Sequence, residues 1–426
     1  MFRFDLKGHN TDVKTEVIAG ISSFLAMLYI VPVNAAILSV SGMPYDALIS
    51  ATAIITIIAT LINVFWSNTP VAMSVGMGLN IYFSYGLVQG LGLSWQSALG
   101  IEVVSSFLYL IISLTPLRRW IVESMPMDVK RAISAGIGAF IALIGFEQLH
   151  IIVKNKESLV SLGDLTAPPV LIGLLGMFLG IGLLIRRVKG AFILTIILTA
   201  LLSWILGIAP FPHDFVSMPA SIAPIFAKMD FEAILKWSMI PVILTFLVTD
   251  IFDTLGTLTG LGLRAGFFRE RHSEALERSI QADAVGTFLS GFFGVTSTTP
   301  FIENAAGVEA GGRTGLTALV TASLFVLPLF FLPFFKAIPS FAIYPVLILI
   351  GAMMFSELKS IDYDDPASLY STFFMVLGMP LTYSITDGMM LGALAYVAVR
   401  LVQGRLMENK GMIFMAIVGL LLFFVL

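Results

Sequence analysis

Long apolar stretches separated by short polar connections run along the whole chain. Charged side chains are absent from residues 17–45, 47–101, 284–302 and 337–356. A helix needs about 20 predominantly apolar residues to cross the hydrocarbon core of a membrane. Windows of this length and longer predict an integral membrane protein that crosses the bilayer many times.

Hydropathy predicts fourteen spans in two successive sets of seven. The first set lies near residues 17–39, 47–66, 69–88, 96–116, 132–150, 167–185 and 190–208. The second set lies near 238–262, 280–294, 298–311, 314–335, 338–356, 366–383 and 386–403. An odd number of spans in each half gives the halves opposite orientations, as in transporters built from inverted repeats.

The predicted fold is therefore an all-α polytopic membrane protein organised as a 7+7 inverted repeat. The first repeat covers residues 1–210 and the second covers residues 211–410. Residues 411–426 form a hydrophobic tail that is short for a span. The sequence leaves open whether this tail crosses the membrane.

Basic residues in the connecting segments predict the orientation, because cytoplasmic loops carry an excess of lysine and arginine. With the N-terminus inside, the outer segments hold only five of the 24 basic residues, namely Lys154, Lys156, Lys228, Lys236 and Lys336. The polar N-terminal stretch has no cleavable signal pattern, so the first span is expected to act as an uncleaved anchor. The expected location is the inner (cytoplasmic) membrane, with the N-terminus in the cytoplasm.

Composition narrows the function. The 426 residues are 58% hydrophobic and 12% charged, with no cysteine. Disulfides and thiolate metal sites are therefore excluded, and no metal site or nucleic-acid partner is expected. The sequence has no glycine-rich phosphate-binding loop of the GxxxxGK[ST] type, which disfavours an ATP-driven pump.

Two segments interrupt the apolar pattern at matching places in the two halves. The third span contains NTPVAMSVGMGLN, and the tenth contains GVTSTTPFIENAAGVEAGGRTG. Proline removes a backbone donor and disfavours helix in the residue before it, so extended backbone is expected around residues 296–302. Broken helices in corresponding positions of two repeats indicate a binding site near the middle of the membrane.

Three acidic residues at membrane depth are the main candidates for chemistry, because ionisable groups are costly there and mark functional sites. Asp250 and Asp253 lie three residues apart in the eighth span and are predicted to share one helix face. Burial disfavours the charged form of a carboxyl group, so both are candidates to take up a coupling proton. Glu303 follows the extended stretch of the tenth span, at the expected start of a helix. All three are also candidates to bind the substrate or carry the proton.

Other polar and aromatic residues near the interrupted segments are weaker candidates. Asn80, at the end of the GMGLN run, could bind the substrate or could make an interhelical hydrogen bond. Phe301 could stack on a flat ligand, and Asn304 adds amide groups beside Glu303. Glu102 is interpreted as reaching the membrane interface, and Glu147 with His150 as an outer interfacial pair.

The motifs TDIFDTLGTLTG and STTPFIENAAGVEAGGRTGLTALV resemble those of the adenine/guanine/hypoxanthine permeases. These form the AzgA-like branch of the nucleobase–cation symporter-2 superfamily. The segments IAGISSFLAMLYIVPVNAAIL, GMGLNIYFSYG and LGMPLTYSITDG resemble the same family, so the similarity covers essentially the whole chain. The chain departs from the usual pattern at Val75, Pro300, Phe301 and Asn304, which leaves the preferred purine open.

The resemblance implies a transporter that takes up purine bases with protons and needs no other cofactor. It implies a core domain from spans 1–4 and 8–11 that moves like an elevator against a gate domain from spans 5–7 and 12–14. It also implies a homodimer in the lipid bilayer. By motif, the family's substrate-binding and proton-coupling acids correspond to Asp250, Asp253 and Glu303. The family's asparagine in the third span corresponds to Asn80.

The alternatives are a uracil or xanthine carrier, an anion permease of the same fold, and an intramembrane aspartyl protease. An anion permease needs a positive site, and the predicted spans offer no lysine or arginine near the carboxylates. A protease of this kind carries its two aspartates on separate helices with a GxGD motif, which the chain lacks. The sequence therefore predicts a transporter and no enzyme activity.

Overall fold

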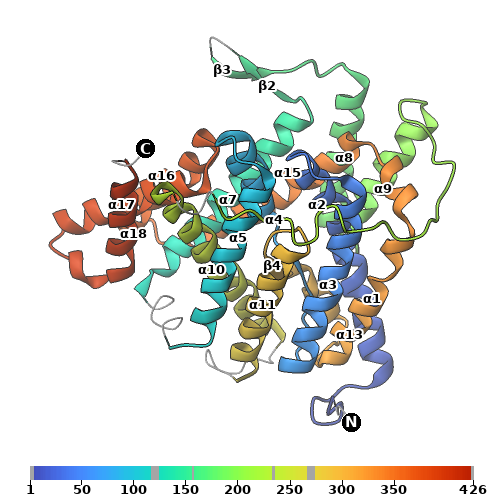
Figure 1. The fold of residues 1–426 in the computed structure, drawn as a ribbon, viewed down its shortest axis with the longest axis horizontal. Helices are drawn as coiled ribbons and strands as arrows, with labels where there is room; N and C mark the ends of the chain where they lie inside the picture. Colours follow the sequence, from blue (N-terminus) through green and yellow to red (C-terminus); the bar gives the residue numbers. More distant parts are fainter. Residues whose placement is uncertain (1–3, 117–123, 156–157, 233–235, 266–273, 424–426) are drawn as a thin grey trace.

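The computed structural model describes residues 4–116, 124–155, 158–232, 236–265 and 274–423. Over these ranges the chain is a bundle of helices with two small two-stranded sheets (Figure 1). Seven of the described helical segments are long and apolar enough to cross a membrane. The structure thus confirms a helical, multi-span architecture, while the count of fourteen spans and the inverted repeat stay predictions.

Helices form at most of the predicted spans, and their bounds agree with the hydropathy pattern to within a few residues. They are α3 (Tyr45–Ser67), α5 (Trp95–Ser113), α7 (Met127–Gln148), α8 (Pro168–Ile185), α9 (Ala191–Ile205), α10 (Ile240–Ala265), α11 (Glu274–Phe292), α15 (Ser340–Phe355), α16 (Pro366–Thr382) and α17 (Ile385–Val402). The C-terminal tail forms α18 (Lys410–Phe423), which contacts α17.

The first predicted span is confirmed at Val13–Ser39, but its helix is interrupted. It consists of α1 (Val13–Met27) and α2 (Ile30–Ser39), with Leu28 and Tyr29 between them. Pro32 lies in the first turn of α2 and has no N–H to offer the Leu28 carbonyl. The break places the Tyr29 side chain in the protein interior, where it is 1% exposed.

The span predicted at 314–335 is also divided. It contains α13 (Gly315–Leu324), a 3-10 turn (η5, Leu327–Phe330) and α14 (Leu332–Ala337), with prolines in the first turns of the last two. A second departure from the prediction is a hairpin of β2 (Ile152–Asn155) and β3 (Leu159–Leu162) after α7. This polar connection was not predicted to contain strands.

The interrupted third and tenth spans meet each other, as the sequence predicts. Strand β1 (Met73–Val75) pairs antiparallel with β4 (Thr298–Pro300), with Ser74 opposite Thr299. Short helices follow both strands: α4 (Met77–Ile81) and a π-helix (η1, Tyr82–Gly90) after β1, and a 3-10 turn (η4, Ile302–Asn304) and α12 (Ala305–Glu309) after β4. The extended stretches predicted from Gly and Pro are confirmed.

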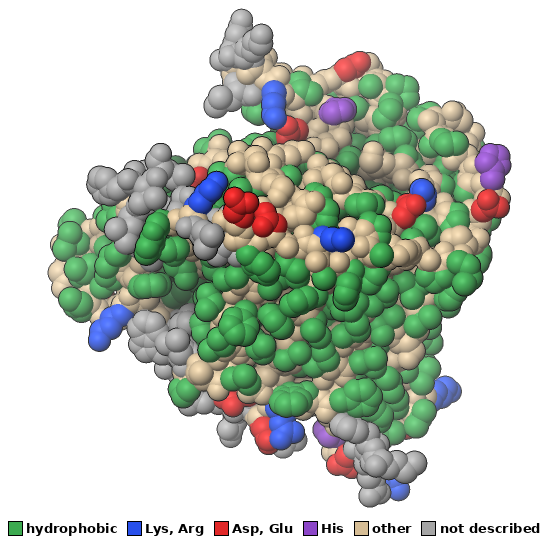
Figure 2. All heavy atoms as spheres, viewed as in Figure 1, with side chains coloured by type: hydrophobic (Ala, Val, Ile, Leu, Met, Phe, Trp, Pro, Cys, Tyr) green, Lys and Arg blue, Asp and Glu red, His purple; other side chains and the backbone are tan. Residues whose placement is uncertain are grey.

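The helices pack in two groups on either side of this crossing. One group contains α1, α3, α5, α10, α11 and α13, and the other contains α7, α8, α9, α15, α16 and α17. The core and gate domains that the resemblance implies stay a prediction. In the space-filling view, hydrophobic side chains form a broad band, and charged side chains gather along its two edges (Figure 2).

A buried carboxylate fastens α1 to α13. Glu16 is fully buried and accepts hydrogen bonds from the backbone N–H groups of Arg313 and Thr317, at 3.0 and 3.1 Å. It also accepts one from the Thr317 hydroxyl at 2.5 Å. The positive end of a helix dipole favours an anion, so Glu16 stabilises the start of α13 beside the tenth span.

Candidate functional site

Asn304 holds the two extended segments together. Its Oδ1 accepts a hydrogen bond from the Ala72 N–H at 3.0 Å, and its Nδ2 donates to the Ala72 carbonyl at 2.8 Å. The same Nδ2 donates to the Phe301 carbonyl at 2.7 Å. Asn304 is fully buried, and both polar atoms of its amide are engaged in these hydrogen bonds. Its geometry therefore suits it to hold the two segments in place.

Glu303 lies in the 3-10 turn directly after β4 and is hydrogen-bonded by a residue that the sequence analysis missed. The Tyr29 hydroxyl donates to Glu303 Oε1 at 2.6 Å. The Tyr29 ring is 4.8 Å from the Phe192 ring and 6.5 Å from the Phe301 ring, centroid to centroid. Glu303 is only partly buried, so its carboxylate has one fixed partner and remains accessible beside an aromatic wall.

Asp250 and Asp253 lie three residues apart in α10, as predicted, but they differ in exposure. The Asp250 side chain is 3% exposed and its Oδ2 has no hydrogen-bond partner. Asp253, one turn further along α10, is exposed. Asp253 lies near the Thr299 hydroxyl and within electrostatic reach of Glu303. Asp253 and Glu303 are therefore both accessible and near each other, while Asp250 is buried.

Glu102 was interpreted as an interfacial residue, and the structure corrects this. Its side chain on α5 is fully buried, and neither carboxylate oxygen has a hydrogen-bond partner. It lies near the backbone of Ser297 and within electrostatic reach of Asp250. Hydropathy placed it near the end of a span, but the packing of α5 against α10 and α11 encloses it.

A further buried acid, Asp283 on α11, was not recognised in the sequence. Its Oδ2 accepts hydrogen bonds from the hydroxyls of Thr254 at 2.5 Å and Tyr109 at 3.2 Å. Its Oδ1 accepts one from the Thr298 hydroxyl at 3.4 Å. The available signal was an aspartate inside a predicted span, which by itself is a reason to suspect function.

Asn80 takes part in a chain of buried amides and hydroxyls. Its Nδ2 donates to Asn34 Oδ1 at 2.5 Å, and Asn34 Nδ2 donates to Thr52 Oγ1 at 2.7 Å. The Oδ1 of Asn80 has no hydrogen-bond partner. This is the interhelical bond that the sequence analysis kept open as an alternative, and a direct role in substrate binding stays a prediction.

Glu147 does not pair with the His150 side chain as predicted. Its carboxylate accepts a hydrogen bond from the Tyr383 hydroxyl and lies 3.4 Å from Lys154 Nζ. These contacts join the end of α7 to the start of the β2–β3 hairpin and to the connection between α16 and α17.

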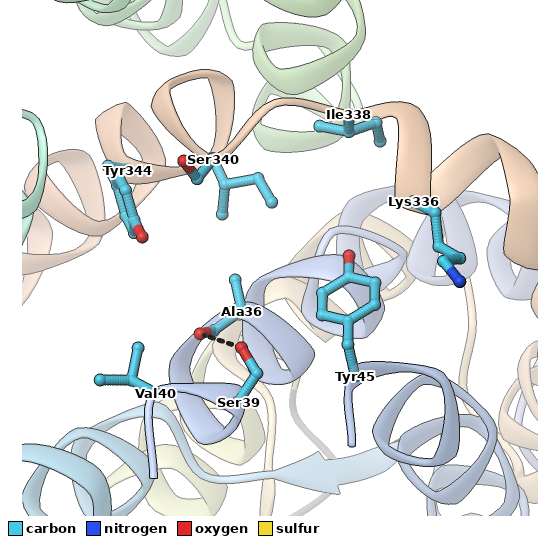
Figure 3. A pocket seen from close by; sticks show the side chains of 9 residues that line it. Ala36, Ser39, Val40, Tyr45, Lys336, Ile338, Ser340 and Tyr344 are labelled. Atoms are coloured by element: carbon cyan, nitrogen blue, oxygen red, sulfur yellow. Dashed lines mark hydrogen bonds between the residues drawn. The ribbon is translucent and has the colours of Figure 1, made fainter. Parts of the chain in front are cut away.

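A cavity of about 400 Å³ lies between the two helix groups (Figure 3). Its lower wall comes from α2 and the start of α3, and its upper wall from α14 and α15, with Tyr45 and Tyr344 on opposite sides. Lys336 at its edge is 3.0 Å from Asp46 Oδ2, so this cation is paired. The cavity is lined by neither Glu303 nor Asp253 and is separate from the acidic site.

The acidic site has a consistent electrostatic character. Among the described residues, no ion pair joins Glu303, Asp253, Asp250, Glu102 or Asp283 to a lysine or arginine, and no group of His, Cys, Asp and Glu side chains is arranged to hold a metal ion. A site of carboxylates and hydroxyls suits a neutral ligand with N–H donors better than an anion.

A bundle of apolar helices in which two interrupted spans meet beside buried carboxylates defines a membrane permease. The comparison with known families agrees with this class. Residues 14–391 match the model of the permease family, and the chain belongs to that family.

Relatives that match over nearly their full length narrow the class further. The chain is 35% identical to a guanine/hypoxanthine permease of Bacillus subtilis, covering 99% of each chain. It is 35% identical to an adenine permease of Escherichia coli, covering 95% of this chain and 91% of that one. A putative permease of Methanocaldococcus jannaschii is 41% identical over 99% of this chain and 97% of that one. The resemblance predicted from the motifs is confirmed.

Solved structures show the same fold at low sequence identity. The transmembrane domain of a cyanobacterium bicarbonate transporter superimposes with a TM-score of 0.60 at 15% identity, covering 96% of each chain. This similarity concerns the fold alone.

Proposed function

We propose that this protein takes up purine bases (guanine, hypoxanthine or adenine) across the cytoplasmic membrane. The observation that carries the proposal is the accessible carboxylate pair Glu303 and Asp253 beside the β1–β4 crossing. Full-length similarity to a guanine/hypoxanthine permease and to adenine permeases supports the same substrate class.

The chemistry of this site matches a flat, neutral base. A 6-oxopurine presents N–H donors along one edge, and a carboxylate offers acceptors for them. A ligand that left these acceptors unpaired would lose about 1–3 kcal/mol for each. Phe301 and Tyr29 supply aromatic surface next to Glu303, and offset stacking on a ring adds about 0.5–1.5 kcal/mol.

The carboxylates take different parts in the proposed mechanism. Glu303 and Asp253, which are accessible, contact the base, and Phe301 packs against it. Asp250 is buried behind them and serves coupling rather than ligand contact. Asn304 and Asn80 position the interrupted spans.

Transport by proton symport follows from these groups, because a carboxyl group at membrane depth that lacks a cation is suited to gain and lose a proton. The two helix groups support a core that carries the site and moves like an elevator against a gate. In the same proposal the protein has fourteen spans in inverted repeats, a cytoplasmic N-terminus and a homodimeric assembly.

Uptake of labelled bases by cells lacking their own purine permeases tests the proposal. Competition by unlabelled guanine, hypoxanthine, adenine, uracil and xanthine at equal concentration ranks the substrates. We expect the purines to compete and bicarbonate or sulfate to have no effect. Competition by uracil alone would replace the purine assignment, and inhibition by the anions would favour an anion permease.

The variant Glu303→Gln tests the site itself. It keeps the size of the side chain but replaces an acceptor oxygen by a donor, and we expect uptake to fall at least about tenfold. Glu309→Gln, six residues later on an exposed position, is the matched control and should transport normally. Full uptake by Glu303→Gln at normal membrane abundance would refute the assignment.

A further inference from the structure

Glu102 is a fully buried carboxyl group that the proposed binding site does not use. Both of its oxygens lack hydrogen-bond partners, and its helix α5 packs between α10 and α11 near the centre of the molecule (Figure 1). An isolated carboxylate without hydrogen bonds is very costly to bury, and such a group instead takes up a proton. The surroundings of Glu102 therefore favour its neutral form.

Asp283 provides an internal comparison within the same helix cluster. It is equally buried, yet three hydroxyl groups donate to it, from Thr254, Tyr109 and Thr298. Hydrogen bonds to the charged form stabilise a carboxylate, so the three hydroxyl groups offset part of the cost of ionising Asp283. Glu102 has no such donors and also lies within the same acidic region, which adds to the cost of ionising it.

Glu102 and Asp250 meet at the residue that precedes β4. Glu102 lies near the Ser297 backbone and Asp250 near the Ser297 hydroxyl, and the two carboxyl groups are within electrostatic reach of each other. Asp250 Oδ2 is also without a hydrogen-bond partner. Two carboxyl groups that interact this closely gain and lose protons as a unit.

The charged groups around this pair come from α10 and α11. Asp253 and Asp283 both act on Asp250. Other described charged groups nearby are engaged elsewhere or exposed. Arg278 pairs with Glu274 at the start of α11, and Glu303 is bonded by Tyr29. Lys130 lies over the Phe252 ring, and Glu309 is exposed. The pair thus has acidic neighbours and no cationic partner among them.

We propose that Glu102 and Asp250 together form the site of the coupling proton, next to Ser297 and distinct from the ligand-binding carboxylates Glu303 and Asp253. The proposal rests on the proposed function, because it assigns the proton that accompanies the base. A proton that enters from water forms one O–H bond on the pair and cancels one negative charge. Its release on the other side of the membrane breaks that bond and restores the charge.

The position of Ser297 connects this site to the ligand. Ser297 directly precedes β4, and Thr299 within β4 lies near Asp253. A change in charge on the pair therefore acts on the strand that leads to the turn carrying Glu303. In this way proton binding and purine binding can influence each other without sharing an atom.

The variant Glu102→Gln tests the proposal, because the neutral amide mimics the protonated acid. Purified protein in liposomes is given an inward proton gradient of one pH unit with the membrane potential clamped at zero. At one proton per base, the wild type should accumulate labelled guanine or hypoxanthine about tenfold. Glu102→Gln should reach only the outside concentration, yet exchange labelled for unlabelled base across preloaded vesicles. The control Glu309→Gln should accumulate base as the wild type does.

Each outcome bears on one of the two proposals. A wild type that transports no purine would overturn the proposed function. A Glu102→Gln protein that accumulates base tenfold would overturn the proton site, and so would one that fails to fold in detergent, since a neutral residue should be tolerated there. Accumulation by the wild type that follows a sodium gradient instead would also overturn it. Loss of exchange together with accumulation would show a structural role, against the proposal.

Discussion

The hydrogen bond from Tyr29 to Glu303 can be removed without disturbing the packing around it. Tyr29→Phe deletes the hydroxyl that donates to Glu303 Oε1 at 2.6 Å and keeps the ring that packs against Phe192. We expect the carboxylate to lose its fixed orientation and the base to bind more weakly. The folded structure should change little, because the aromatic contact remains.

The expected size of the effect follows from the nature of the bond. A hydrogen bond to a charged group contributes about 1.5–3 kcal/mol, and 1.4 kcal/mol corresponds to a factor of about ten in affinity. Glu303 is only partly buried, so water can replace some of the lost interaction. We therefore expect the lower end of the range, which is about a tenfold rise in KM.

Initial rates of labelled guanine uptake, measured over a range of concentrations, separate KM from the maximal rate. The matched control is Tyr363→Phe, because the Tyr363 hydroxyl donates to the Leu358 carbonyl at 3.0 Å on an exposed turn. The control should leave KM unchanged. Tyr29→Phe should raise KM while the maximal rate, corrected for the amount of protein in the membrane, stays within about twofold.

An unchanged KM for Tyr29→Phe would refute the argument that Tyr29 orients a ligand-binding carboxylate. A fall in the maximal rate with no change in KM would contradict it as well, because it would place Tyr29 in the conformational change. An equal rise in KM for Tyr363→Phe would show that the measurement reports general damage.

Two further predictions concern the hydrogen bonds that hold the interrupted spans. Asn304→Ala removes three hydrogen bonds to backbone groups, two of them at Ala72. This should lower the free energy of unfolding by about 3 kcal/mol. A thermal unfolding midpoint in detergent equal to that of the wild type would contradict this. Glu16→Ala leaves the N–H groups at the start of α13 without their acceptor and should also lower the midpoint by several degrees. Its control, Glu274→Ala, breaks only an exposed ion pair with Arg278, which is worth about 0–1 kcal/mol.

Most of the helix positions could be predicted from hydropathy, because a span needs a long run of apolar residues wherever it lies in the fold. The interruption of the third and tenth spans could also be predicted, since Gly and Pro mark broken helices, whereas the pairing of β1 with β4 could not be read from these residues. The break at Tyr29 was not predicted. Its signal was Pro32 alone, and prolines are common in membrane helices.

The candidate carboxylates were identified individually, but their surroundings depend on contacts between distant residues. Asp250 and Asp253 are three residues apart and differ in burial, a difference set by the elements packed around α10, which lie far away in the sequence. Glu102 was misplaced because its depth depends on how α5 sits against its neighbours. Tyr29 is separated from Glu303 by 274 positions, so no local sequence pattern could have predicted the hydrogen bond between them.

Three of the acids in this region differ in the number of hydroxyl donors that reach them. Asp283 has three, Glu303 has one, and Glu102 has none. Since each donor favours the ionised form, Glu102 is the acid of the three whose ionisation is least supported by its surroundings. The carboxyl groups of Asp283 and Asp253 near Asp250 also make a second ionisation there more costly. We therefore expect the Glu102–Asp250 pair to hold its proton until the strand between it and the ligand moves.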